Sequence, residues 1–166
     1  MTRTVAVFGL IVGGALLLGQ AAAEEAPSAH RKASAATIPA NFLDLLTTKK
    51  AFAHLATINP KGGPQVTPVW FDFDGHYIRI NSARGRVKDR NMRRDPRVAL
   101  SILDPDNPYR YVTIGGRVVK ITEEGAVDHI NALAKKYRGV DSYRGGRPGE
   151  VRVMYLIEPR RVAGQG

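Results

Sequence analysis

The chain has 166 residues, of which 25 are Lys or Arg and 15 are Asp or Glu, so its formal net charge is +10. This length fits one domain with a self-supporting core, and 43% apolar residues exclude an intrinsically disordered chain. The absence of cysteine excludes disulfide scaffolds, thiol catalysis, and zinc or iron–sulfur sites held by cysteine. The positive excess indicates an anionic partner, which could be a nucleic acid, a membrane surface or a phosphorylated small molecule.

The first 23 residues have the layout of a secretory signal peptide. Arg3 gives a positive start, Val5–Leu18 is an apolar run, and small residues end at Ala23, where we expect cleavage. The run is shorter than the roughly 17–25 residues that a membrane span requires. We therefore expect export to the periplasm or cell exterior without stable membrane insertion after cleavage, and an uncleaved membrane anchor is the alternative. Residues 24–38 are expected to form a flexible linker, and residues 39–166 the folded domain.

In that domain, hydrophobic periodicity and turn residues predict three helices and six strands. The predicted helices are a short one after Pro39, a basic one over Arg84–Asp95, and one over Glu123–Tyr137 that Thr122 caps. The predicted strands are Ala51–Asn59, Gln65–Asp74, His76–Ser82, Arg97–Asp104, Arg110–Thr122 and Val151–Ile157.

Turn residues set the expected connections between these strands. Asp74-Gly75 predicts a tight hairpin, so the first three strands should form an antiparallel meander. Gly115-Gly116 predicts a bulge or a sharp barrel corner inside a long strand. Because strands and helices do not alternate as they do in parallel sheets, the pattern indicates a closed or partly closed antiparallel barrel.

The positive charge is concentrated in one segment. Between Arg79 and Arg97 there are eight basic and two acidic residues, a net charge of +6 in 19 residues. Arg86 and Lys88 fall at the expected start of the second helix, where free backbone N–H groups and the helix dipole attract anions. The segment predicts a phosphate site, and a solvated basic helix is the alternative. Export and the lack of interleaved aromatic residues argue against a nucleic-acid partner.

Four stretches together resemble a known family. They are His54–Ile58 before the Gly62-Gly63 turn, Gln65–Phe71, Gly85–Leu100 and Arg147–Val151. In order and spacing they are similar to the pyridoxamine 5'-phosphate oxidase-like superfamily, and within it most similar to the deazaflavin-dependent oxidoreductases, which use coenzyme F420. The likeness spans about residues 39–162. It implies a mainly β fold, a six-stranded antiparallel split β-barrel of the FMN-binding type, and a homodimer with a flavin-type ring at the subunit interface.

The resemblance also implies where the cofactor, F420 or FMN, would bind. Arg86 and Lys88 would hold its phosphate, and the polar residues that would support them are Asn81, Ser82 and Asn91. The backbone of Thr67-Pro68-Val69 would pass beside the ring. Pro68 supports this, because a proline inside a strand cannot donate to a β-ladder and indicates an edge or an interruption. Trp70 is expected to pack in the core or the dimer interface.

These expectations lead to a function without an assigned catalytic residue. Hydride would pass between the bound cofactor and a small organic acceptor, and the alternative is a non-catalytic carrier or sensor that holds a flavin or a haem in the same barrel. The four histidines lack metal-ligand spacing, so no metal is expected. The C-terminal Glu158–Val162 has no histidine nearby, unlike true pyridoxamine phosphate oxidases, so that activity is not expected.

Overall fold

The computed structural model describes residues 35–166. The expected signal peptide and residues 24–34 of the expected linker lie outside the described residues. Ala36 already donates its N–H to the Pro159 carbonyl at 2.8 Å, and Ile38 is buried. Packing against the sheet thus starts before Pro39. In the part of the chain that the structure describes, no helix is both long and apolar enough to cross a membrane.

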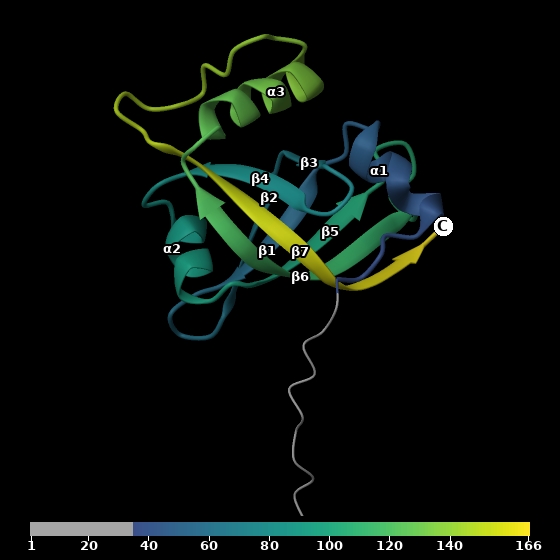
Figure 1. The fold of residues 1–166 in the computed structure, drawn as a ribbon. Coiled ribbons are helices and arrows are strands. Elements are labelled where there is room, and N and C mark those ends of the chain that lie inside the picture. Colours follow the sequence, from purple (N-terminus) through teal and green to yellow (C-terminus); the bar gives the residue numbers. More distant parts are fainter. Residues whose placement is uncertain (1–34) are drawn as a thin grey trace, which may run out of the picture. The chain divides into compact units, whose positions relative to one another are not determined.

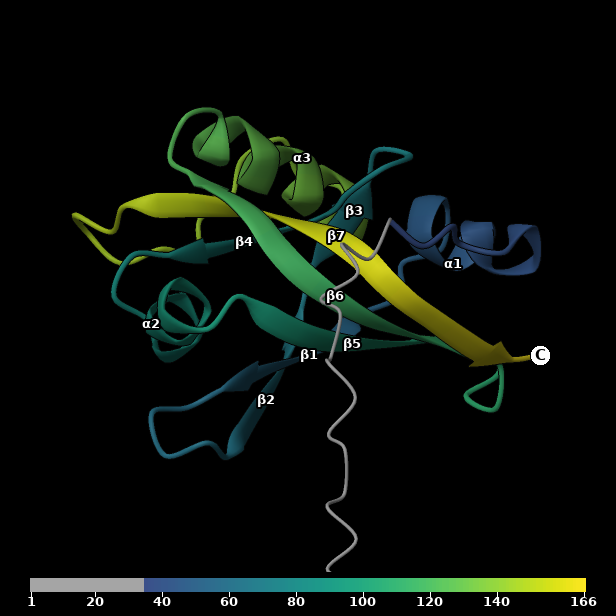
Figure 2. The same ribbon diagram turned by 60° about the horizontal axis from the view of Figure 1, so that its bottom comes forward.

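Residues 35–166 form one curled, fully antiparallel sheet with helices around it (Figures 1 and 2). The strands are β1 (Ala53–Ile58), β2 (Pro64–Val69), β3 (Phe71–Phe73), β4 (Ile78–Ala83), β5 (Arg97–Leu103), β6 (Tyr111–Thr122) and β7 (Arg152–Gln165). Their order in the sheet is β2-β1-β5-β6-β7-β4-β3. The mainly β half-barrel agrees with the expected fold class, but the described chain has seven strands where six were predicted.

The extra strand arises because the predicted strand Gln65–Asp74 breaks at Trp70. Its first half, β2, pairs with β1, and its second half, β3, pairs with β4. These two halves lie at opposite ends of the sheet order. The backbone must therefore change partner at Trp70, and the curled sheet brings its two ends together there. Both antiparallel pairings of the expected meander are present, but its middle strand is divided between the two ends of the sheet order.

The inner face of the curled sheet carries the core. Leu55, Phe71, Ile80 and Tyr155 are all fully buried, and burying each such side chain contributes roughly 1.5–3 kcal/mol. The predicted bulge is confirmed, because the β6–β7 register shifts between Gly115 and Gly116.

The bulge also explains the length of β7. A Cβ atom at Gly116 would lie 2.6 Å from the Ile157 side chain, so only glycine allows this approach. Gly116 lies opposite Pro159, whose missing N–H falls at the irregularity. The strand therefore continues past its predicted end at Ile157.

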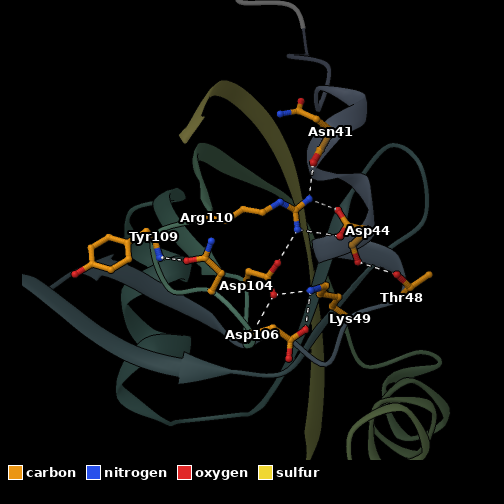
Figure 3. A network of polar contacts seen from close by, with 9 residues as sticks. Asn41, Asp44, Thr48, Lys49, Asp104, Asp106, Tyr109 and Arg110 are labelled. Carbon is orange, nitrogen blue, oxygen red and sulfur yellow. Dashed lines mark hydrogen bonds and ion pairs between the residues drawn. The ribbon is translucent and has the colours of Figure 1, made fainter. Parts of the chain in front are cut away.

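The first helical segment consists of a 3₁₀ turn, Ala40–Phe42, and α1, Leu43–Thr47. Phe42, Leu45 and Leu46, which follow the i, i+3, i+4 spacing of one helix face, are buried. Charged side chains fasten this segment to the start of β6 and the loop before it (Figure 3). Arg110 donates to Asp104 at 2.8 Å and to Asp44 at 2.6 Å.

Lys49 extends the same network, since its ammonium group bonds Asp104 at 2.6 Å and Asp106 at 2.8 Å. Figure 1 places α1 on the opposite side of the sheet from α2, Val87–Arg94. The charged network therefore holds the end of the sheet remote from α2.

The longest helix, α3, spans Ala126–Arg138. Gly125 occupies its N-cap, so the predicted cap by Thr122 was wrong. The Thr122 hydroxyl instead accepts the Glu124 N–H at 3.1 Å in the turn before the helix. Gly139, with φ +72°, ends the helix in the left-handed conformation. Figure 1 shows the loop after α3 running back along the helix to the start of β7.

Candidate functional site

A cavity of about 460 Å³ lies beside Trp70, where the backbone leaves β2 and enters β3. Its walls come from segments far apart in the sequence: β2, β4, the start of α2, α3, the loop after α3, and the start of β7. The lining residues are Phe52, Pro68, Val69, Trp70, Asn81, Ser82, Arg86, Lys88, Ile130, Tyr137, Arg138, Tyr143 and Arg152. These residues form a cationic part, which contains Arg86, Lys88 and Arg152, and an aromatic part around Trp70.

The cationic part is built on a rigid turn before α2. The Arg86 N–H donates to the Ala83 carbonyl at 3.3 Å, and Gly85 has φ +79°, a conformation that suits glycine. The Gly85 N–H donates to the Asp89 carboxylate at 2.8 Å. Asp89 is buried and also accepts the Tyr155 hydroxyl. This anchoring fixes the entry to the helix.

Burial alone would raise the pKa of Asp89. The hydrogen bonds from Tyr155, Gly85 and Arg93 outweigh burial and hold the pKa of Asp89 below its usual value. Asp89 is therefore an ionised anchor at neutral pH. Arg86 occupies the N-cap of α2 and makes no side-chain cap, so the first-turn N–H groups have no side-chain acceptor from the N-cap.

The three side chains of the cationic part differ in how they are partnered. Arg86 pairs with Glu150, with a distance of 2.9 Å from Nε to Oε1. Arg152 donates to the Asn81 amide oxygen at 2.8 and 2.6 Å and lies 3.3 Å from Glu150. Lys88 has no hydrogen-bond or ion-pair partner among residues 35–166.

Lys88 is half-buried. Burial lowers its pKa, and the neighbouring charges of Arg86 and Arg152 lower it further. An anion placed beside Lys88 would relieve that repulsion. Because Glu150 supplies the one negative charge on these three cations, the cluster keeps a net positive charge.

The rest of the basic segment is satisfied within the fold. Apart from Lys88, every basic side chain from Arg79 to Arg97 contacts a carboxylate or a backbone carbonyl. The pairs are Arg79–Asp72, Arg84–Glu123, Arg86–Glu150, Arg90–Gly85, Arg93–Asp89, Arg94–Ile58 and Arg97–Asp95. Within the described chain, the basic side chains of this segment therefore stabilise the fold through hydrogen bonds and ion pairs. Lys88 is the exception, because it is unpaired and lines the cavity.

Ser82 gives a second sign that the cavity holds a polar ligand. Its hydroxyl is buried, lines the cavity and has no hydrogen-bond partner in residues 35–166. Buried polar groups in native proteins are nearly always bonded. A polar ligand in the cavity would give the Ser82 hydroxyl the partner that it lacks.

The aromatic part presents a fixed indole. Trp70 stacks on Tyr137, with ring centroids 5.2 Å apart and planes 3° apart. Arg138 lies over the Trp70 ring at 5.0 Å, and Tyr143 meets it edge-on at 5.9 Å. Trp70 is not in the core of residues 35–166 but is half-buried on the cavity wall, and its expected place in a dimer interface stays a prediction.

Tyr137 is held in turn by the backbone. Its hydroxyl donates to the Ala51 carbonyl at 2.7 Å and accepts the Phe71 N–H at 3.3 Å. Burial raises the pKa of Tyr137 to about 12, so the phenol stays protonated at neutral pH. The stack therefore has a rigid support.

The structure brings six of the eight predicted site residues to the cavity: Pro68, Val69, Asn81, Ser82, Arg86 and Lys88. Thr67 is not among the lining residues, and its buried hydroxyl has no hydrogen-bond partner within residues 35–166. Asn91 is buried in α2 and donates to the Thr57 hydroxyl at 3.0 Å. It is part of the contact between α2 and β1, not of the cavity.

Other wall residues carried no usable signal in the sequence. Tyr137 and Arg138 end a helix, and Tyr143 lies in a loop rich in glycine and arginine. Arg152 opens the last strand, where a polar residue beside apolar neighbours is ordinary. Within the described chain, no three His, Cys, Asp or Glu side chains gather in a metal-binding arrangement.

Comparison with known proteins finds a family that matches this chain and solved structures that are similar to it. The family described as pyridoxamine 5'-phosphate oxidase matches residues 38–166. A solved F420 reductase is 34% identical with a TM-score of 0.67, and the match covers 76% of this chain and 98% of that chain. A conserved hypothetical protein from Mycobacterium tuberculosis is 26% identical with a TM-score of 0.61, covering 80% and 87%.

A putative pyridoxamine 5'-phosphate oxidase from Listeria innocua has the same fold. It is 21% identical with a TM-score of 0.57, covering 75% of this chain and 94% of that chain.

Proposed function

The chain belongs to the pyridoxamine 5'-phosphate oxidase family, and from this premise we propose that the cavity beside Trp70 binds a flavin-type cofactor, coenzyme F420 or FMN. The proposed activity is that of an oxidoreductase, in which hydride passes between the cofactor and a small organic acceptor. One observation carries the proposal: an unpaired Lys88 and an unbonded Ser82 hydroxyl share a cavity with an aromatic wall. The 34% identity to an F420 reductase favours F420 of the two cofactors.

The cationic part of the cavity fits the phosphate that both cofactors carry on their ribityl arm. Lys88 and the free N–H edges of Arg86 and Arg152 would donate charge-assisted hydrogen bonds to its oxygens. The start of α2 would add backbone N–H groups, and Ser82 would gain the partner that it lacks. This set of donors supports the proposal of a phosphate site.

The aromatic part fits the ring. β2 stands at one end of the sheet order, so one side of its backbone has no neighbouring strand. Pro68 and Val69 present this segment to the cavity beside Trp70. The bound cofactor would supply the hydride chemistry, and the chain would bind it, orient it and exclude water around it.

We extend the proposal to assembly and location. A hollow of about 800 Å³ lies over β1, β2, β5, β6 and β7, and its exposed or half-buried apolar lining residues are Ala56, Val66, Ala99, Val162 and Ala163. Such a face marks an interaction surface, and we propose that a second copy covers it in a homodimer. We further propose export through residues 1–23. Light scattering tests the dimer, and N-terminal sequencing of the secreted protein tests cleavage after Ala23.

The deciding experiment is a titration of the purified protein with F420 and with FMN. Binding is followed by the visible absorbance of the cofactor and by quenching of Trp70, the only tryptophan in the chain. Micromolar or tighter binding of either cofactor supports the proposal, and binding of neither refutes it. Binding without turnover across a panel of reductants and organic acceptors would assign the protein to carriers or sensors instead, and haem is titrated in parallel for that alternative.

A further inference from the structure

Glu150 occupies a turn whose geometry aims its side chain at the cations. The Glu150 N–H donates to the Arg147 carbonyl at 3.0 Å, which closes a four-residue turn. Pro148 and Gly149 occupy its centre, and Gly149 has φ +74°. This is the sequence and conformation of a type II turn. The turn sets the Glu150 backbone beside the start of β7, and contacts with Arg86 and Arg152 hold its carboxylate.

That carboxylate joins two arginines from different parts of the fold. Its Oε1 atom accepts from Arg86 Nε at 2.9 Å, at the start of α2. Its Oε2 atom lies 3.3 Å from Arg152 Nη1, at the start of β7. The Glu150 and Arg152 side chains are only 10% and 9% exposed, so their contact is screened weakly, whereas the Arg86 side chain is 41% exposed.

Glu150 contacts two residues of the cavity wall but is not itself part of that wall. Arg86 and Arg152 line the cavity, whereas Glu150 does not. Arg152 donates to Asn81 through Nε and Nη2 and to Glu150 through Nη1, which leaves two of its five N–H groups free. Both arginines therefore keep donors for a ligand while their positions are already fixed.

We propose that Glu150 is the positioning residue of a phosphate clamp, which we define as Arg86, Lys88 and Arg152. Glu150 holds the two arginines in place before the phosphate binds, so the ligand does not have to order these long side chains. Lys88 supplies the charge that remains unpaired. This inference rests on the proposed function, because the phosphate is that of the cofactor.

The direction in which Glu150→Gln changes phosphate affinity distinguishes a positioning role from a purely electrostatic effect. Glu150→Gln makes the site more positive, so electrostatics alone predicts tighter phosphate binding. Positioning predicts weaker binding, by about tenfold, because Arg86 and Arg152 must then be ordered by the ligand. Glu150→Asp keeps the charge and shortens the side chain, so positioning again predicts a loss, whereas a field effect predicts wild-type affinity.

The measurement uses inorganic phosphate, FMN and riboflavin, which lacks the phosphate, in calorimetric titrations of the full protein. Glu123→Gln is the matched control. Glu123 is another carboxylate paired with an arginine, Arg84, but neither residue lines the cavity. Circular dichroism and the melting temperature establish that each variant folds, and the Nε–Hε signals of Arg86 and Arg152 in NMR spectra report their order directly.

The proposal is supported if both Glu150 variants weaken phosphate and FMN about tenfold, leave riboflavin unchanged and broaden the two arginine signals, while Glu123→Gln resembles wild type. It is overturned if either folded Glu150 variant binds phosphate as tightly as wild type or tighter. It is also overturned if wild type does not bind phosphate at all. If phosphate binds in this pattern but neither F420 nor FMN binds, the clamp stands and the proposed function fails.

Discussion

Replacing Lys88 by methionine should weaken binding of a phosphate-bearing cofactor without harming the fold. Methionine keeps much of the side-chain volume and removes the charge. Lys88 lines the cavity and has no partner among the described residues, so its loss orphans no carboxylate. The change therefore isolates the attraction between one ammonium group and the ligand.

The magnitude follows from the position of Lys88. Two unit charges 4 Å apart attract by about 1 kcal/mol in bulk water and about 4 kcal/mol near a protein surface. A half-buried lysine lies between these limits, so we expect a loss of about 2 kcal/mol, which is about 30-fold in Kd.

Stability should move in the opposite direction. Burial lowers the pKa of Lys88, and Arg86 and Arg152 lower it further. When the pKa is lower in the folded state, the charged form costs stability at neutral pH, and that cost disappears as pH rises past the folded pKa. Lys88→Met removes the charge, so its melting temperature should equal or exceed that of wild type.

The assay is a fluorescence titration of Trp70 with F420 and FMN at about 0.15 M salt, where long-range attraction is screened beyond about 8 Å. Lys120→Met is the matched control, because Lys120 is exposed and does not line the cavity. Lys88→Arg should retain most of the affinity. If Lys88→Met binds both cofactors as tightly as wild type, the cationic part of the cavity is not a phosphate site.

Three further substitutions test the structure around this site. Gly85→Ala should cost roughly 1–2 kcal/mol in urea unfolding, because φ is +79° and no atom lies near the added methyl group; an unchanged midpoint would contradict the turn. Ser82→Ala removes an unbonded hydroxyl, so stability should hold while cofactor affinity falls about fivefold; equal affinity would remove Ser82 from the site. Burial alone would raise the pKa of Asp72, but hydrogen bonds from His129 and Arg79 lower it to about 2. Stability from Asp72 should therefore be present above about pH 4 and lost as pH falls toward 2, by at most about 2 kcal/mol. Asp72→Asn should flatten that part of the curve of unfolding free energy against pH, and an unaltered slope would contradict the assignment.

The sequence predicted the helices and most strands because their signals are local. The apolar positions Leu45 and Leu46, the Asp74-Gly75 turn and the Gly115-Gly116 bulge all act through near neighbours in the chain. The break at Trp70 has a different cause. Strand-forming residues continue through it, and only the pairing of β2 with β1 and of β3 with β4 divides the segment.

The same distinction separates the parts of the site. Arg86 and Lys88 were predicted from their place at a helix start, which is a local property. Asn91 resembles its neighbours in that segment, but its contact with Thr57 lies 34 residues away. Arg152 and Tyr143 reach the cavity only because β7 pairs with β4 and the loop after α3 folds back (Figure 1). Such contacts depend on the assembled sheet.

The change of partner at Trp70 also bears on the order of folding. The β1–β2 and β3–β4 pairs join neighbouring segments, so each hairpin can form early, within about 1–10 μs. The β4–β7 and β1–β5 pairs join distant segments, and such non-local pairing is slow. Trp70 alone connects the two early hairpins. The cavity walls opposite Trp70, however, come from α3 and β7. The chain therefore exposes its only tryptophan until the last strand docks, and the rate at which Trp70 becomes protected from solvent should report completion of the binding site.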